Sequence, residues 1–484
     1  MKKILKTALA VVIAVLMLTT VCFADFVPYP SYTLDINLKA MPTAPCYLPK
    51  EVIGGKMYEG LSLKSPEDLY LYENMLIICD TGNKRVVALD IDNGYEQIYE
   101  ITTFGVAEGE AQDTFAAPYG ACVANEQLYI TDKDNGRIVV FNVADGSYVK
   151  IIGAPDMSLS ALKDIQYKPL KVGVDSNDRL FVVGEGITDG LIQMSQEGKF
   201  IRYFGSNTVT PNLAEIMLRK FMTNEQIAKR VINIPIEYNN ISIDGDDFVY
   251  VTTDNVTTLQ IKRLNALGGN IMTTTGRTKG KYGQTNGSAV HMKDVSADQY
   301  NNVYGITLNG TIYQYNQLGD VLNIFGGTGT AVGTFSSPEA IHVTADGKKI
   351  YVLDSYKASV TVFEATEFGE KVLQANNSFV EGRYEDSLDL WAEVIRLNGN
   401  YDVAYTGIGN AYMQEKEYEL AMKNFKLGEN RKDYSKAYSE YRAKLLSDNF
   451  SWIMTGIVVL IVVLVLLRKP LKKFADAIKR FVNA

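Results

Sequence analysis

The sequence predicts a multidomain protein with an all-β propeller of six blades, then an α-helical repeat module, then one transmembrane helix. Three observations support this prediction. A strand-rich unit recurs six times between residues 56 and 366, as expected of blades with a period of about 40 to 60 residues. The apolar period then changes from two to helical over residues 367–449. Finally, residues 450–467 contain no charged side chain.

The N-terminal residues 1–24 have the order of a cleavable export signal. Lysines precede an apolar run over residues 8–18, and the segment ends in the small-residue site 22–24. We therefore expect export. A lipid-bearing Cys22 is the alternative, but Val21 stands where a lipoprotein site needs a small residue. The mature chain keeps Cys46, Cys79 and Cys122, which we expect to be buried small apolar residues and not a disulfide framework.

The repeated unit is sharpest in its first, second and sixth copies. In each of these copies a Pro precedes one strand and an Asp stands at the turn after the next strand. Short strands separated by Asp, Asn and Gly turns are typical of antiparallel blades. We expect the Asp side chains to bond local backbone amides, in preference to forming a cation-binding ring. The repeat-turn residues are Asp80, Arg85, Asp132, Arg137 and Asp354.

This pattern of Pro, strand, Asp-x-x-x-x-Arg turn and apolar strand resembles the NHL repeat. The resemblance implies a six-bladed propeller over residues 56–366, with copies three to five matched by spacing and strand pattern. Within the N-terminal segment 25–55, we expect residues 32–35 to complete the last blade and close the ring. Residues 211–231 are predicted as two short helices that pack against the propeller side, with a lid over the channel as the alternative.

The helical region resembles tetratricopeptide (TPR) repeats. A pattern of aromatic and small residues recurs after 34 residues, which is the TPR length. A third helix from residue 434 to 446 is expected to cap two repeats. The resemblance implies docking of a protein partner, and two repeats need support from a neighbour. The motif residues are Tyr384, Ser387, Trp391, Tyr405, Gly409, Tyr412, Tyr418, Ala421 and Phe425.

The apolar segment 450–467 is followed at once by a basic cluster. Positive residues flank the cytoplasmic ends of membrane helices, so the sequence predicts a single-pass protein with an extracytoplasmic body. The tail 468–484 has the pattern of a basic amphipathic helix on the inner leaflet. The chain carries a formal net charge of −8, and removal of the basic ends makes the body more acidic. Nucleic acid is therefore not an expected partner.

Carboxylates and an amide near the starts of the inner strands form the candidate ligand site at the channel mouth. We expect no catalytic residue, cofactor or metal, because His291 and His342 occupy non-equivalent repeat positions and no hydrolase or phosphate-binding motif is present. The predicted function is an extracytoplasmic binding or scaffold protein for a glycan, peptide or protein, accessory to a surface transport or envelope complex. A metal-dependent lactonase or lyase is the alternative. The candidate site residues are Glu67, Asp68, Asn240, Asp294 and Glu339.

Overall fold

The computed structural model describes residues 27–35, 39–55, 60–105, 112–156, 166–206, 236–253, 260–271 and 290–482. The chain divides into two compact units, Met1–Glu370 and Lys371–Ala484. Two predicted segments, the export signal 1–24 and the insertion 211–231, lie outside the described residues.

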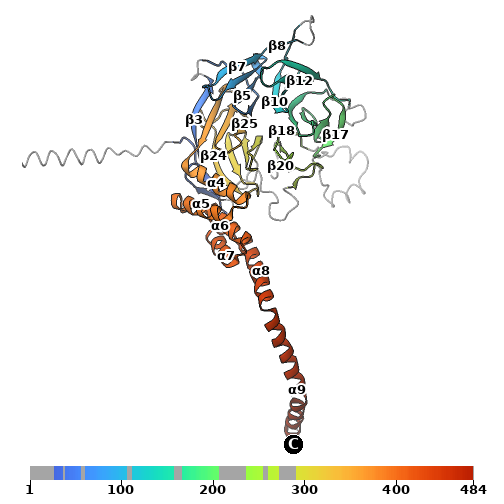
Figure 1. Cartoon of the computed structure of the whole chain (residues 1–484), viewed down its shortest axis with the longest axis vertical. Helices are drawn as coiled ribbons and strands as arrows, with labels where there is room; N and C mark the ends of the chain where they lie inside the picture. The colour runs from blue at the N-terminus through green and yellow to red at the C-terminus, as the bar shows by residue number, and fades with distance from the viewer. Residues whose placement is uncertain are drawn as a thin grey trace, which may run out of the picture. The chain divides into compact units, whose positions relative to one another are not determined.

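The first unit is built from antiparallel sheets arranged about a common centre (Figure 1). Apolar and β-branched residues fill these strands, as in β5 and β15, and tight turns join them. Between β10 and β11, for example, Asn125 and Glu126 both adopt positive φ, the geometry of a type I′ hairpin turn. The first three blades consist of β4 (Asp68–Tyr72), β5 (Met75–Asp80), β6 (Arg85–Asp90) and β7 (Glu96–Ile101); β10 (Pro118–Ala124), β11 (Gln127–Asp132), β12 (Arg137–Asn142) and β13 (Tyr148–Ile152); and β14 (Pro169–Val174), β15 (Leu180–Gly184), β16 (Leu191–Met194) and β17 (Phe200–Phe204).

The remaining three blades follow in chain order, and a short hairpin of β8 (Thr103–Phe104) and β9 (Asp113–Thr114) lies between blades one and two. Blade four shows three strands within the described ranges. These blades consist of β18 (Tyr238–Ile243), β19 (Val249–Thr253) and β20 (Ile261–Leu264); β21 (Met292–Ala297), β22 (Val303–Thr307), β23 (Thr311–Tyr315) and β24 (Val321–Gly326); and β25 (Pro338–Val343), β26 (Lys349–Asp354) and β27 (Ser359–Ala365).

The innermost strands close a ring. In order, β4, β10, β14, β18, β21 and β25 each contact the next, and β25 contacts β4. Apolar clusters fill the spaces between neighbouring blades, as between blades one and two, where Ile77, Phe104 and Phe141 are buried together. This radial packing covers both faces of most sheets. The predicted six-bladed β-propeller is confirmed.

The strand that completes blade six is not the one that we predicted. It is β3 (Tyr47–Gly54), which pairs antiparallel with β27 from Gly54 to Tyr47. The predicted segment 32–35 forms β1 (Tyr32–Leu34), which instead pairs with β24 of blade five and with β2 (Ala40–Pro42). The longer strand β3 offers more ladder hydrogen bonds, and it buries Tyr47 completely against the ring of Phe325 at 5.3 Å.

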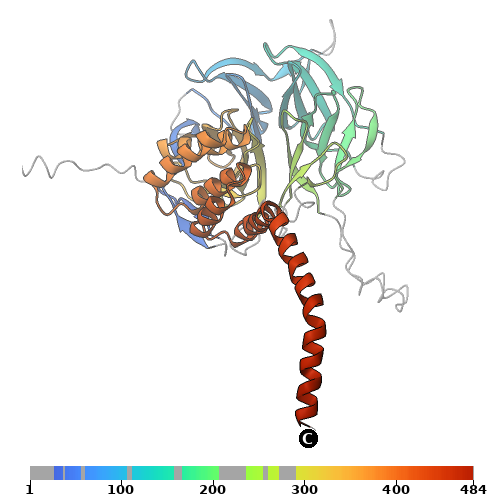
Figure 2. The ribbon, with the colours of Figure 1, turned by 60° about the horizontal axis from the view of Figure 1, so that its bottom comes forward.

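The C-terminal unit is helical (Figure 2). Aromatic residues fill its core: Trp391 and Phe425 are buried, and glycines give them room. A Cβ on Gly407 would lie 2.5 Å from the Trp391 ring, and a Cβ on Gly409 would lie 2.5 Å from the Phe425 ring. The helices are α4 (Glu367–Val380), which crosses the boundary between the two units, α5 (Tyr384–Leu397), α6 (Asp402–Gln414), α7 (Tyr418–Leu427), α8 (Arg431–Asp448) and α9 (Phe450–Val482).

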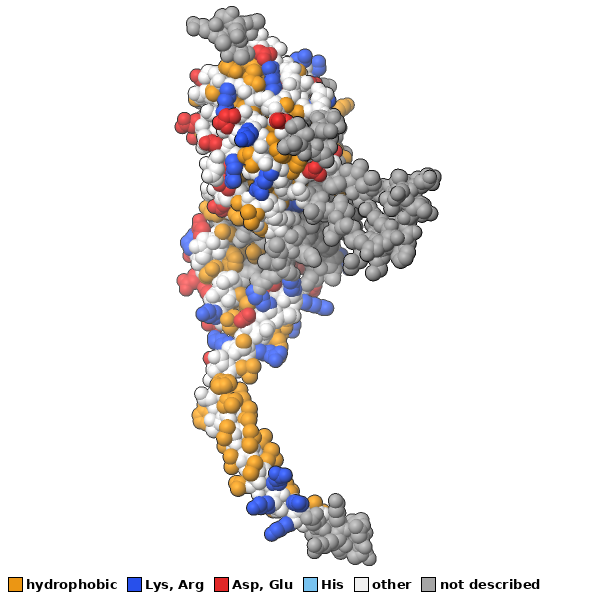
Figure 3. Space-filling model, turned by 90° about the vertical axis from the view of Figure 1, so that its right-hand side faces the viewer, with side chains coloured by type: hydrophobic (Ala, Val, Ile, Leu, Met, Phe, Trp, Pro, Cys, Tyr) orange, Lys and Arg blue, Asp and Glu red, His pale blue; other side chains and the backbone are white. Residues whose placement is uncertain are grey.

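Helix α9 contains the candidate membrane span. Its segment Phe450–Lys473 is long and apolar enough to cross a membrane by length and composition. Figure 3 shows hydrophobic side chains covering this helix, with basic side chains gathered beyond them. The helix continues past Leu467, where we predicted the span to end, into the basic cluster.

Candidate binding site in the propeller channel

A cavity of about 290 Å³ lies at the centre of the propeller. Residues from all six innermost strands line it. Its position explains why residues far apart in the sequence meet there: each blade contributes the same part of its first strand. The lining therefore depends on which residue each blade carries at equivalent positions of the repeat.

A β-bulge recurs near the start of the innermost strand. In blades two to six the pairing with the second strand shifts by one residue at this place. A bulge adds one residue to the strand and re-aims its side chains. Residues around the bulge therefore determine the chemistry of this end of the channel.

Three of the five predicted site residues line the cavity. Asp68, Asn240 and Asp294 hold the equivalent position in blades one, four and five, and in blades four and five this residue directly follows the bulge. Glu67 and Glu339 precede that position by one residue and do not line the cavity. They nevertheless face each other closely enough to interact: burial raises the pKa of Glu67, and the charge of Glu339 raises it further.

Lys171 also lines the cavity and was not among the predicted site residues. It holds the same position in blade three and is only 5% exposed. Its Nζ lies 2.7 Å from Oδ1 of Asp68 and donates a 2.9 Å hydrogen bond to the backbone oxygen of Glu67 in blade one. Counting two residues from Pro169, as Asp68 follows Pro66, would have found it.

Blade two provides the space for this contact. It carries Gly120 at the equivalent position, and a Cβ there would lie 2.5 Å from the backbone oxygen of Leu170 and 3.0 Å from Cα of Lys171. Contacts under 3.0 Å are not tolerated without movement of the backbone. The glycine lets blade three approach blade two, so that the lysine reaches blade one.

Lys171 and Asp68 each stabilise the charged form of the other. Burial alone lowers the pKa of Lys171, but the carboxylates of Asp68 and Asp294 outweigh it and the pKa is raised. Burial raises the pKa of Asp68, and the Lys171 ammonium opposes that shift. We therefore treat the two groups as a buried ion pair at neutral pH.

Asp294 differs from Asp68 because no described cation lies within ion-pair distance of it. Burial raises its pKa to about 7, against the lowering effect of Lys171. Its two oxygens accept hydrogen bonds from the backbone amides of Val295 at 2.6 Å and Ile341 at 2.7 Å. The second of these bonds ties blade five to blade six, so this carboxylate also has a structural role.

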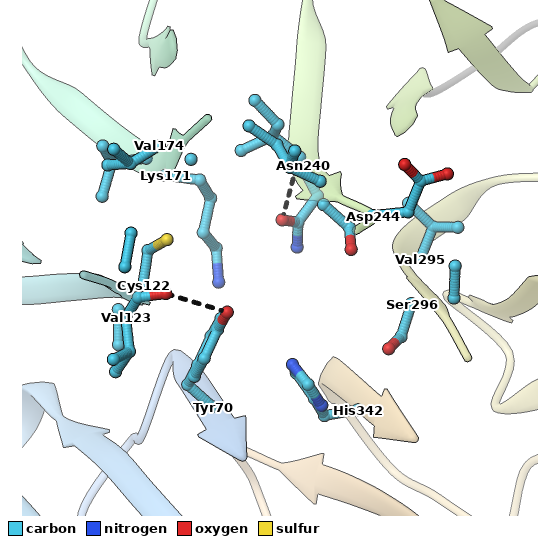
Figure 4. A pocket seen from close by; sticks show the side chains of 18 of the residues that line it. Tyr70, Cys122, Val123, Lys171, Val174, Asn240, Asp244, Val295, Ser296 and His342 are labelled. Atoms are coloured by element: carbon cyan, nitrogen blue, oxygen red, sulfur yellow. Dashed lines mark hydrogen bonds between the residues drawn. The ribbon is translucent and has the colours of Figure 1, made fainter. Parts of the chain in front are cut away.

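Asn240 and His342 add further polar groups. Oδ1 of Asn240 accepts a 2.7 Å bond from the amide of Ile241, while its Nδ2 bonds to none of the described residues. Burial lowers the pKa of His342 to about 4, so the ring is neutral at pH 7, and its Nδ1 has no partner in the described structure. Figure 4 shows Lys171, Tyr70, Asn240 and His342 pointing into one common space.

On the adjoining edge, Lys293 forms a 2.7 Å ion pair with Glu339. The mouth thus carries both signs of charge. Within the described ranges, no three or more His, Cys, Asp and Glu side chains are grouped as a metal site requires.

The repeat-turn residues make local hydrogen bonds. Asp80 accepts from the amide of Lys64 at 2.7 Å and from Nε of Arg85 at 2.7 Å. Asp132 accepts from two backbone amides at 2.9 and 3.0 Å and from Nε of Arg137 at 3.0 Å. Asp354 accepts from the amides of residues 336, 337 and 357.

The cysteines of the described residues are buried and free, namely Cys46, Cys79 and Cys122. Burial raises the pKa of each thiol, which keeps them protonated and unreactive at neutral pH.

In the helical unit, the predicted motif residues divide into two groups. Ser387, Trp391, Gly409, Ala421 and Phe425 are buried between the helices. The four tyrosines are half-buried: Tyr384, Tyr405, Tyr412 and Tyr418.

A scan against protein-family models finds no match for this sequence, and a search of curated proteins finds none either. Among solved structures, similarity is found to hydrazine synthase of Kuenenia stuttgartiensis. The identity is 12% and the TM-score 0.38, over 64% of this chain and 99% of that chain. So remote a similarity carries no argument about function.

Proposed function

We propose that this protein is a membrane-anchored extracytoplasmic binding protein and not an enzyme. In this proposal the NHL-type propeller binds a ligand in its channel, and the TPR-type helices dock a protein partner. The cavity lined by polar groups from all six blades is the observation that carries it. A channel with several convergent polar groups is the usual form of a small-ligand site.

Three features support the anchoring and the orientation. The N-terminal sequence has the order of an export signal, helix α9 has a segment of membrane-spanning length, and basic residues follow that segment. We infer that the body lies outside the cytoplasm and that the protein serves a surface transport or envelope complex.

The helical unit supports docking of a protein. Large apolar side chains are exposed on it, among them Leu397 at 49% and Leu427 at 52%. Its buried residues repeat at the spacing that TPR helices use, and such repeats present their surface to peptides and proteins.

Co-purification from membranes dissolved in mild detergent tests this proposal. The full-length chain and a chain lacking residues 384–427 are compared, with cell-surface protease accessibility as the readout of orientation. We expect a stoichiometric protein partner with the full chain alone, and an accessible propeller. A body protected from external protease, or equal recovery of the partner without the helices, would contradict the proposal.

The alternative is a metal-dependent lactonase or lyase. It is favoured by the oxygen-bearing side chains of Asp68, Asn240 and Asp294, since carboxylate and amide oxygens are ligands for divalent cations. It is opposed by the ammonium of Lys171, which lies 2.7 Å from Asp68. Metal analysis of the purified full chain decides: a stoichiometric metal whose removal abolishes a measured turnover would establish the enzyme.

A further inference from the structure

We propose that the channel binds a single neutral polyhydroxylated unit, such as one sugar ring, between the Asn240 amide, the Lys171 ammonium and the Asp294 carboxylate. This inference rests on the proposed function, because it names the chemical class of the ligand at the same site.

Unused hydrogen-bond donors are the first observation. Asn240 is 4% exposed, yet its Nδ2 has no partner among the described residues, and it points into the cavity (Figure 4). This nitrogen opens onto the cavity, where water or a ligand can accept its hydrogen bonds. Lys171 uses two of its three N–H groups on blade one, and the hydroxyl of Ser242 lines the same cavity without a described partner.

Unused acceptors lie in the same space. Each oxygen of Asp294 accepts one backbone amide and therefore keeps a second lone pair. The Tyr70 hydroxyl donates to the backbone oxygen of Val123, and a phenolic oxygen can also accept a hydrogen bond. A sugar hydroxyl both donates and accepts, so a ring of hydroxyls matches this mixture of groups.

The charges exclude ligands of either sign. An anion that approached Lys171 would also meet the carboxylate of Asp68, which lies 2.7 Å from Nζ of that lysine. A cation that approached Asp294 would meet the Lys171 ammonium, which already has two partners. Between the protein walls of the channel these repulsions are screened less than at an exposed surface. A neutral ligand avoids both.

The size of the cavity limits the ligand to one unit. The cavity volume of about 290 Å³ lies just below the range of about 300–1,000 Å³ that is usual for small-ligand sites. We therefore expect recognition of a terminal or free unit, and not of the middle of a chain.

Binding of sugars that share one ring and differ in charge tests the inference. The probes are glucose, glucuronate and glucosamine, with galactose and mannose to vary the hydroxyl orientation. Binding to the full-length chain, in a detergent without a sugar head group, is measured by saturation-transfer NMR and calorimetry. We expect at least one neutral sugar to bind, and its charged counterparts to bind at least about tenfold more weakly.

The matched variants are Asn240→Asp and Gln97→Glu. N240D keeps the acceptor for the Ile241 amide but replaces the donor in the cavity with a carboxylate, so neutral-sugar affinity falls about tenfold or more. Q97E makes the same chemical change on the exposed outer strand β7 and leaves the affinity unchanged. Ser242→Ala, a smaller change, gives a several-fold loss and replaces N240D if that variant fails to fold.

Each other result overturns the inference. Preferred binding of glucuronate or glucosamine refutes the neutral class, and absence of binding by all probes refutes the sugar ring. Full affinity of N240D and S242A refutes the placement. Capture of a protein partner in the co-purification above is unaffected by any of these outcomes, so failure here does not mean failure of the proposed function.

Discussion

Two groups of buried aspartates in the propeller, those at the turns after the second strands and those at the wall of the channel, differ in their partners. In the turn, Asp132 is fully buried and bonds to two amides and Arg137. In the channel, Asp294 bonds to two amides but has no described cation beside it. A carboxylate whose acceptor sites are filled locally supports the fold, whereas one that keeps capacity beside a cavity can also serve a ligand.

Loss of a turn carboxylate should lower the stability of the propeller more than any change in the channel. Asp132→Ala leaves two backbone amides and Nε of Arg137 without their acceptor, and each buried donor left unsatisfied costs about 1–3 kcal/mol. We expect a large fall in the thermal midpoint of the propeller, followed by circular dichroism. Asp145→Ala, at an exposed turn of the same blade, should cost about 0.5 kcal/mol. Equal losses in the two variants would contradict the distinction.

Removal of the Lys171 ammonium from the channel should lower the stability of the propeller by a smaller amount. Lys171→Met leaves the carboxylate of Asp68 without its 2.7 Å partner, but the adjoining cavity admits water, so we expect a loss of about 2 kcal/mol. The double variant Asp68→Asn with Lys171→Met should recover part of this loss, because no unpaired charge remains. Denaturant unfolding measures both, and an additive double variant would show that the two groups do not interact.

The smallest effect concerns pH. The pKa of Asp294 is raised to about 7 from its ordinary value of 3.8, so between these values the folded state binds a proton that the unfolded state does not. Stability is therefore highest below the ordinary pKa and falls as pH rises through 7. From pH 6 to 8 we expect a loss of about 1 kcal/mol from this group. Thermal midpoints of Asp294→Asn should depend less on pH over this interval, and an unchanged slope would contradict the role of Asp294.

His342 contributes to the pH dependence of stability with the opposite sign, so wild type must be compared with D294N. Its folded pKa is lowered to about 4, so its contribution to stability is lost as pH falls from its ordinary value of 6.5 toward 4. Both proteins contain His342, so its contribution cancels when the stability of D294N is subtracted from that of wild type.

The repeated blades were predictable because their signals are local. Asp80, Asp132 and Asp354 occupy the same turn in sharp copies of the unit, and the period alone then places the looser copies. The closing strand was not predictable in the same way. Both segment 32–35 and segment 47–54 have the pattern of a strand, and the second is favoured by its longer ladder with β27 and by the contact of Tyr47 with Phe325.

The channel was predictable in part for a similar reason. Position in the repeat places Asp68, Asn240 and Asp294 at the cavity wall, because equivalent residues of a propeller face the same axis. The reach of Lys171 from blade three to blade one depends on the missing side chain at Gly120 and on the bulge. Neither is visible from the properties of Lys171 itself.

The pairing of β3 with β27 sets the order in which the protein can become complete during synthesis. Residues 47–54 must wait for residues 359–365 before their edge is covered. Contacts so distant in sequence form late, and an uncovered strand edge invites pairing with other chains. A chain that ends before residue 359 would therefore leave two strand edges uncovered, those of β3 and β26.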